Sequence, residues 1–154
     1  MTKFFAHILN NEIISKGQTP MLNEGAINIE VTGEIYNNIE NYKLKDGNMT
    51  KKTAAEIKKE AAKKERDRLD KLSLTAADVE RAIYKARDID FEDVLTLAEN
   101  TPELDIKALK IELKANNFYR GNPFVSQIGA ILGFTTEQLD AFFETGNYEA
   151  LIND

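Results

Sequence analysis

TAAEIKKEAAKKERDRLDKL, residues 53–72, is the stretch that divides this chain. Thr53 and Glu56 match a helix capping box, and no Gly or Pro follows before Leu72. The apolar stripe is thin and includes Ile57. The sequence therefore predicts a solvated connecting helix, about 29 Å long at 1.5 Å per residue. One helix of an oligomeric bundle is the alternative, for which the heptad pattern is weak.

The segment before this helix has the patterns of a small β unit. KFFAHIL is aromatic and aliphatic, and EIISK follows after Asn10-Asn11, a pair that tolerates left-handed backbone. This order predicts a hairpin. AINIEVT alternates apolar and polar residues as a half-buried strand does. A short helix is expected next, and Asp46-Gly47 then predicts a second hairpin. A unit this small has a marginal core.

The segment after the connecting helix predicts four or five short helices. Its Leu, Ile and Phe residues suffice for a common core. Ile111 is predicted to lie on a buried helix face. Capping residues mark the ends of these helices. The predicted starts are Thr75, Asp90, Thr101-Pro102, Asn122-Pro123 and Thr135, and the predicted stops are Gly133 and Gly146.

The charge distribution supports the same division. Residues 51–72 hold 9 basic and 5 acidic side chains, whereas residues 73–154 hold 7 basic and 15 acidic ones. A positive segment between negative flanks indicates parts with different roles. The sequence therefore predicts an α+β fold: a small N-terminal antiparallel β unit (1–52), a long charged connecting helix (53–72) and a compact all-helical C-terminal unit (73–154).

Composition excludes several kinds of protein. The chain has no cysteine, which rules out disulfides, thiolate metal sites and cysteine nucleophiles. No apolar run reaches the roughly 18–20 residues that span a bilayer. The apolar stretch near the N-terminus is too short for a signal peptide. We expect the chain to stay in the compartment where it is made, with no membrane partner.

Few side chains suggest catalysis. His7, the single histidine, lies in a predicted strand, where packing is its usual role, and no HExxH, GxSxG, P-loop or GxGxxG pattern occurs. The acids in DIDFED, residues 88–93, lack the Gly and the distant Glu of a calcium loop and fit a helix start instead. We predict no enzymatic activity, no cofactor, and no catalytic, cofactor-binding or metal-ligating residue.

Residues 125–145 have the layout of a helix-turn-helix, with Ala130 in the first helix and Gly133 at the turn. Its second helix would present mainly acids, which oppose binding to phosphates. The basic run between Lys51 and Lys71 lacks interleaved aromatics, so a solvated helix is preferred over attraction to nucleic acid or membrane. A DNA-binding regulator is kept as the alternative function, although nucleic acid is not the expected partner.

Aromatic and arginine side chains gather in NNFYRGNPF, residues 116–124. Tyr and Arg are frequent at interface hot spots. Phe118, Tyr119, Arg120 and Phe124 are therefore the candidates for an exposed partner-binding cluster. Packing of these aromatics at a helix end is the alternative.

Motifs along nearly the whole chain carry a family resemblance. They are V-T-x-E-x-Y-x-x-I at 31–39, the Asp-Gly hairpin and KKTAAEI at 51–57, followed by the charged helix. This plan resembles small proteins of the tail region of tailed bacteriophages and prophages, including tail fibre assembly proteins. LSLTAADVERAIYKARDIDFEDVLTLAEN, LDIKALKIELKANNFYRGNPF and IGAILGFTTEQLDAFFETGNYEAL resemble C-terminal regions of prophage tail-cluster proteins from gut bacteria.

The resemblance implies a phage tail-associated structural or assembly protein that acts by protein–protein binding. Its partners would be other phage tail or virion proteins, with a homo-oligomer as a further option. Its location would be the host bacterial cytoplasm during assembly, or the virion tail. Fibre assembly proteins typically lack a helical C-terminal unit, so a structural role stands beside a chaperone role. The family supplies no catalytic residues.

Overall fold

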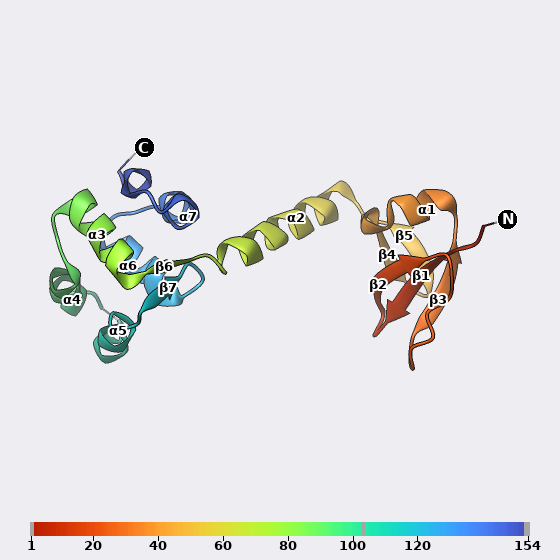
Figure 1. Cartoon of the computed structure of the whole chain (residues 1–154), viewed down its shortest axis with the longest axis horizontal. Helices are drawn as coiled ribbons and strands as arrows, with labels where there is room; N and C mark the ends of the chain where they lie inside the picture. The colour runs from red at the N-terminus through yellow and green to blue at the C-terminus, as the bar shows by residue number, and fades with distance from the viewer. Residues whose placement is uncertain (1, 103, 153–154) are drawn as a thin grey trace. The chain divides into compact units, whose positions relative to one another are not determined.

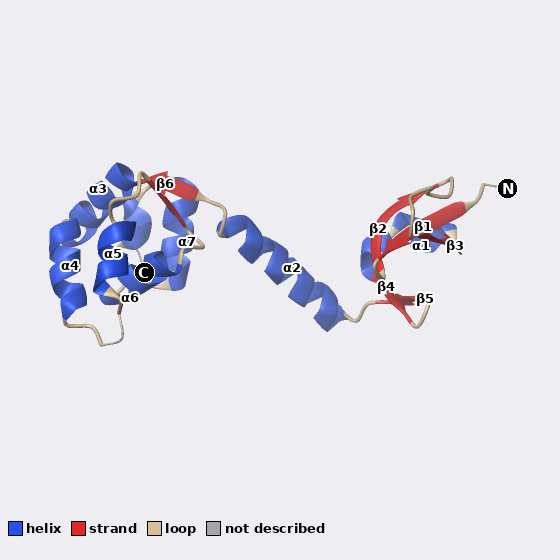
Figure 2. Ribbon diagram, turned by 90° about the horizontal axis from the view of Figure 1, so that it is seen from below, coloured by secondary structure: helices blue, strands red, loops and turns tan. Residues whose placement is uncertain are grey.

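The computed structural model describes residues 2–102 and 104–152 (Figures 1 and 2). The chain forms two compact units, unit 1 (Met1–Ala62) and unit 2 (Lys63–Asp154). The boundary between them falls inside the helix α2 (Ala54–Leu69). Helices and small antiparallel sheets are both present, which confirms the predicted α+β class.

Unit 1 contains a three-stranded antiparallel sheet of order β2-β1-β3 and a separate β4-β5 hairpin. Figure 1 shows β1 between β2 and β3. The elements are β1 (Phe4–Leu9), β2 (Glu12–Gly17), β3 (Ile27–Val31), α1 (Gly33–Asn37), the 3-10 helix η1 (Ile39–Asn41), β4 (Tyr42–Lys45) and β5 (Asn48–Lys51).

Both predicted hairpin turns are confirmed. Asn10 and Asn11 have φ values of 52° and 64°, and Asp46 and Gly47 have values of 51° and 76°. Two consecutive positive φ angles are what a type I′ turn requires. The right-handed twist of the flanking strands favours this turn, so the choice of residues fixes both hairpins locally.

The core of unit 1 is small. Ala6 and Ile8 are the only fully buried apolar side chains found among its described residues. Phe4 packs against Tyr36 of α1 with ring centroids 4.6 Å apart, and Thr32 caps α1 by accepting a hydrogen bond from the Ile35 amide. This helix covers one face of the sheet without creating a deep interior.

The capping box at the start of α2 is confirmed. The Glu56 amide donates to Thr53 Oγ1 at 3.2 Å, and the Thr53 amide donates to Glu56 Oε2 at 2.8 Å. The helix ends at Leu69 rather than at the predicted Leu72. It ends early because the chain next enters a strand that the sequence did not predict.

Unit 2 combines helices with two short paired strands, as Figure 2 shows. The prediction of an all-helical C-terminal unit is therefore wrong in this respect. The pairing places Leu74 opposite Phe118, 44 residues later in the chain, so no local pattern indicates it. The elements are β6 (Ser73–Thr75), α3 (Ala76–Arg87), α4 (Phe91–Glu99), α5 (Ile106–Glu112), β7 (Asn117–Tyr119), α6 (Pro123–Ile131), α7 (Thr136–Thr145) and the 3-10 helix η2 (Tyr148–Leu151).

Most of the predicted helix ends in unit 2 are confirmed. Thr75, Asp90, Asn122 and Thr135 cap their helices through side-chain oxygens. Gly133 and Gly146 follow helices with φ of 73° and 68°.

One predicted helix start is wrong. The Thr101 amide donates to Ala98 O, so Thr101 closes α4, and Asp105 is the cap of α5. The expected burial of Ile111 is also wrong, because this side chain is 71% exposed.

Candidate protein-binding surfaces

The four residues predicted to form an exposed cluster do not form one. Phe118 and Arg120 are only 2% and 3% exposed, whereas Tyr119 is 54% exposed and Phe124 is half-buried. The cause is β7, because side chains alternate between the two faces of a strand. Phe118 points inward and packs edge-on against Phe91, with centroids 5.8 Å apart. Tyr119 is therefore the one member of the set that is more than half exposed.

Arg120 is the buried member of a partly exposed ionic network. Its Nε donates to Asp140 Oδ1 at 2.6 Å, and its Nη1 donates to Ser126 Oγ at 3.1 Å. The same carboxylate accepts two hydrogen bonds from Arg66, at 2.9 and 3.1 Å. The bonding to Asp140 raises the pKa of Arg66 above its ordinary value. A buried guanidinium bonded in this way is a structural group and is unavailable to a partner.

The helix-turn-helix layout predicted at 125–145 is present as α6, a turn and α7. The two helices are in tight contact at Gly129, where an added Cβ would lie 2.5 Å from Leu139 Cδ1. The small residue at the contact is therefore Gly129, whereas Ala130, noted from the sequence, is exposed.

The outer side of α7 is acidic, and two of its carboxylates already bind arginines of the same chain. Arg66 and Arg68, from the last turns of α2, bind Asp140 and Glu144 of α7. Arg68 also pairs with Glu65, and this pair and Glu144 together raise the pKa of Arg68 above its ordinary value. A DNA-reading helix needs free donors on this side, and here the guanidinium groups already serve carboxylates of the same chain.

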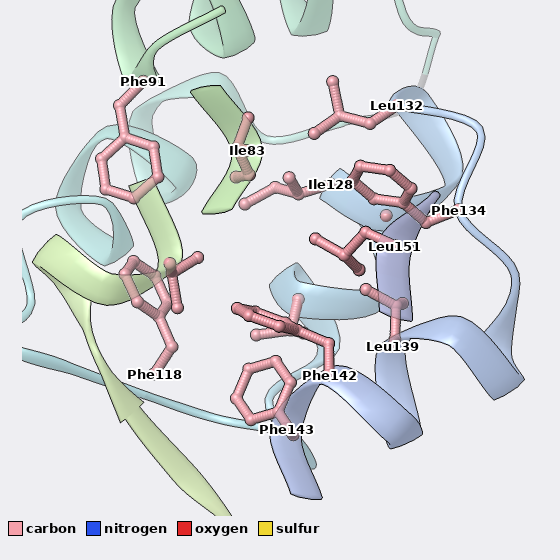
Figure 3. Close-up of a pocket in the computed structure, with 13 residues that line it drawn as sticks. Ile83, Phe91, Phe118, Ile128, Leu132, Phe134, Leu139, Phe142, Phe143 and Leu151 are labelled. Carbon is pink, nitrogen blue, oxygen red and sulfur yellow. The ribbon is translucent and has the colours of Figure 1, made fainter. Parts of the chain in front are cut away.

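A small cavity lies inside unit 2 (Figure 3). Its volume is about 30 Å³, and its lining is entirely apolar. The rings of Phe118, Phe134, Phe142 and Phe143 form part of that lining. Ligand sites in proteins usually measure about 300–1,000 Å³ and include polar groups. The cavity is therefore a gap in core packing and not a ligand site.

A larger, open groove lies on the surface of unit 2. Its volume is about 460 Å³, and it runs between the α4–α5 connection and α6. Pro102 and Leu104 contribute from the connection, and Ala130 and Ile131 contribute from α6. Its mixed polar and apolar lining is typical of protein-binding surfaces. We take this groove as the candidate partner-binding surface of unit 2; sequence reasoning missed it because the two segments are distant in the chain.

The surroundings of His7 indicate a structural role. It is 6% exposed, its Nδ1 lies 2.7 Å from Ser15 Oγ, and its Nε2 lies 3.0 Å from the Thr19 carbonyl oxygen. The carbonyl accepts, so Nε2 carries a proton and Nδ1 faces the hydroxyl. A Cβ on Gly17 would lie 2.9 Å from the His7 ring, which explains the glycine at the end of β2. Both ring nitrogens thus hold a chain reversal in place.

The acids at residues 88–93 serve helix ends. Asp90 and Asp93 form the capping box of α4, and Asp88, with φ of 58°, ends α3. Within residues 2–102 and 104–152, no group of three or more His, Cys, Asp or Glu side chains is arranged to hold a metal ion. Over the same residues, no helix combines the length and apolar character needed to cross a bilayer.

Comparisons with known proteins identify no family for this chain. No family model matches the sequence, and neither a curated protein nor a solved structure matches it. Function is therefore inferred from the surfaces of the two units together with the motifs in the sequence.

Proposed function

We propose that this chain is a phage tail-associated structural or assembly protein that works by binding other tail or virion proteins. It would be found in the host bacterial cytoplasm during assembly, or in the virion tail. The observation that carries the proposal is the exposed, lysine-bearing middle of α2. Together with a surface groove on unit 2, it gives one chain two candidate contacts with partner proteins.

The middle of α2 is exposed to water, and Glu60 in this stretch pairs with Lys52 at 2.6 Å. Every residue from Ile57 to Glu65 is exposed. A helix with so thin an apolar stripe is typical of a solvent-exposed connection between folded parts. Four of its lysines make no ion pair with any described residue: Lys58, Lys59, Lys63 and Lys64. Their ammonium groups fit a partner protein that presents carboxylates.

The groove on unit 2 supplies a second contact. Ala130 is exposed in the groove, and Ile131 beside it is half-buried. An apolar side chain of a partner would remove both from water. Burial of this kind is the main favourable term in protein association, at about 25 cal/mol per Å² of apolar surface.

Association with tail proteins is the direct test. The chain would carry an affinity tag and be produced during particle assembly in the bacterial host of the encoding phage. We expect identified tail proteins to co-purify with the tagged chain, as detected by mass spectrometry. The proposal is wrong if no tail protein is recovered, either from the lysate or from purified particles.

A matched pair of variants tests the groove. Ala130→Glu places a charge inside it and should weaken binding at least about tenfold, because an unpaired carboxylate is costly to bury. Ala141→Glu makes the same change at an exposed alanine of α7 and should leave binding unchanged. Equal losses in both variants would show that the groove is not the contact.

The DNA-binding alternative is less well supported by the site. The second helix of the pair carries Glu137 and Glu144 on its exposed surface, where DNA would bring phosphates. We expect no shift of duplex DNA in low-salt gels. A salt-sensitive shift that disappears when residues of α7 are changed would favour the regulator instead.

A further inference from the structure

The two edges of the unit 1 sheet differ in how they are protected. β2 contains a bulge, because His7 pairs with Ser15 and Ile8 pairs with Ile13, which leaves Ile14 without a partner on β1. Lys16 on this strand reaches the Tyr36 carbonyl oxygen at 2.6 Å. A bulge and a lysine are both features that discourage further pairing at an edge.

The β3 edge has neither protection. β3 pairs in regular register with β1, and none of its five residues is Lys or Pro. Within the described residues, its backbone makes no hydrogen bond outside that pairing. Ile27 at the start of the strand is 61% exposed, and Leu22 in the preceding loop is 96% exposed. Glu30 is the one charged residue of the strand, and Lys3 of the same chain pairs with it. An edge whose outward backbone groups are unpaired is a template for another strand.

We propose that β3 pairs antiparallel with β3 of a second copy of this chain. The product is a continuous six-stranded sheet of order β2-β1-β3-β3-β1-β2, related by a two-fold axis. The axis passes beside Ile29, which lies opposite Ile29 of the second copy. The proposal is independent of the tail-binding function and concerns a different surface.

The sequence of β3 favours β3 of a second copy as the strand that pairs with this edge. Antiparallel pairing centred on Ile29 is the only register in which all five residues of INIEV have partners. In that register Ile27 lies opposite Val31 of the second copy, and Asn28 lies opposite its Glu30. The apolar face then continues across the junction.

Charge also agrees with this register. The two Glu30 carboxylates are not placed opposite each other, and each is bonded by Lys3 of its own chain at 2.9 Å. Centring the pairing on Glu30 would bring the carboxylates together, which is unfavourable. A pair of five-residue strands is small for an interface, so we expect a reversible dimer.

Sedimentation equilibrium of the full chain tests the dimer. We expect twice the mass of one chain at high concentration and the mass of one chain after dilution. Ile27→Lys places a charge on the open edge and should abolish the dimer. Ile14→Lys makes the same substitution on the protected β2 edge, where Ile14 is 45% exposed, and should leave the dimer intact.

Three outcomes would overturn the proposal. The first is a wild-type chain that stays single up to about 1 mM, the weak end of measurable association. The second is a dimer that survives Ile27→Lys. The third is equal loss in the two variants, which would exclude an interface specific to β3.

A cysteine test reads the register directly, because the natural chain has no cysteine. Ile29→Cys places two thiols opposite each other across the axis and should give a disulfide-linked dimer on mild oxidation. Glu30→Cys places them diagonally, with Cα atoms about 7–8 Å apart, too far for a disulfide. Efficient linking of Glu30→Cys, with none for Ile29→Cys, would contradict the proposed register.

Discussion

The fold of unit 1 and the fold of unit 2 depend on different interactions. Unit 2 buries large side chains, including Phe118, Phe142 and Leu109, each at most 2% exposed. Among the described residues of unit 1, the fully buried apolar side chains are Ala6 and Ile8. Apolar burial therefore dominates the stability of unit 2, whereas unit 1 depends more on its turns, caps and polar contacts. We therefore expect unit 2 to be the more stable part of the chain and unit 1 to be only marginally stable.

The largest expected effect is in the core of unit 2. Phe142→Ala removes a ring that is 2% exposed, and we expect the free energy of unfolding of unit 2 to fall by about 3–5 kcal/mol. Tyr119→Ala, at an exposed ring, should change it by less than about 0.5 kcal/mol. Urea denaturation followed by circular dichroism measures both. A loss below about 1 kcal/mol for Phe142→Ala would contradict the role of apolar burial in unit 2.

The ionic network of unit 2 should give the next largest effect. Asp140→Asn leaves the buried Arg120 guanidinium without its carboxylate. We expect a loss of about 3 kcal/mol, at the low end for a broken buried pair because Asp140 is 21% exposed. Glu144→Gln, which breaks the exposed pair with Arg68, should cost at most about 1 kcal/mol. Equal losses in the two variants would mean that burial of Arg120 is unimportant.

The third effect concerns the hairpin turn between β1 and β2, and we expect it to change the stability of unit 1. Asn11 has φ of 64°, a conformation that costs most L-residues about 1–2 kcal/mol. Asn11→Ala should therefore destabilise unit 1 by about 1 kcal/mol, whereas Asn11→Gly should stabilise it slightly. Hydrogen exchange of the β1 and β2 amides reports both changes. Two variants that shift protection in the same direction would contradict the turn assignment.

The smallest effect concerns pH and the start of α2. The hydrogen bond from Lys43, aided by the Thr53 amide, lowers the pKa of Glu56 from 4.5 to about 2. Because the pKa is lower in the folded chain, the carboxylate stabilises it above pH 4.5, and this contribution disappears as the pH falls from about 4.5 to 2. Lys43→Gln should return the pKa toward its ordinary value. A carboxyl NMR titration of Glu56 near pH 4.5 in the natural chain would refute the contact.

Local features were predictable from the sequence, and long-range ones were not. The Asn10-Asn11 turn and the Thr135 capping box depend on neighbouring residues, so their patterns were sufficient. The pairing of β6 with β7 joins segments far apart in the chain. That pairing buries Phe118 and Arg120, which explains why an exposed cluster was predicted where a core residue and a buried ion pair are found.

The candidate binding surfaces were also predictable only in part. The solvated character of α2 follows from its composition, and the structure leaves its middle exposed. The groove on unit 2 requires the α4–α5 connection to meet α6, which no periodicity encodes. Thr101-Pro102 predicts a helix start because Pro favours that position, but the cap of Asp105 determines where α5 begins.

Hydrogen exchange in rising urea, read by mass spectrometry, tests the contrast between the units most directly. We predict that the amides of β1 to β5 lose protection at lower urea concentration than those of α3 to α7. The middle of α2 should exchange earliest, because every residue from Ile57 to Glu65 is exposed. Simultaneous loss of protection along the whole chain would contradict the account, because it would show one cooperative fold instead of two.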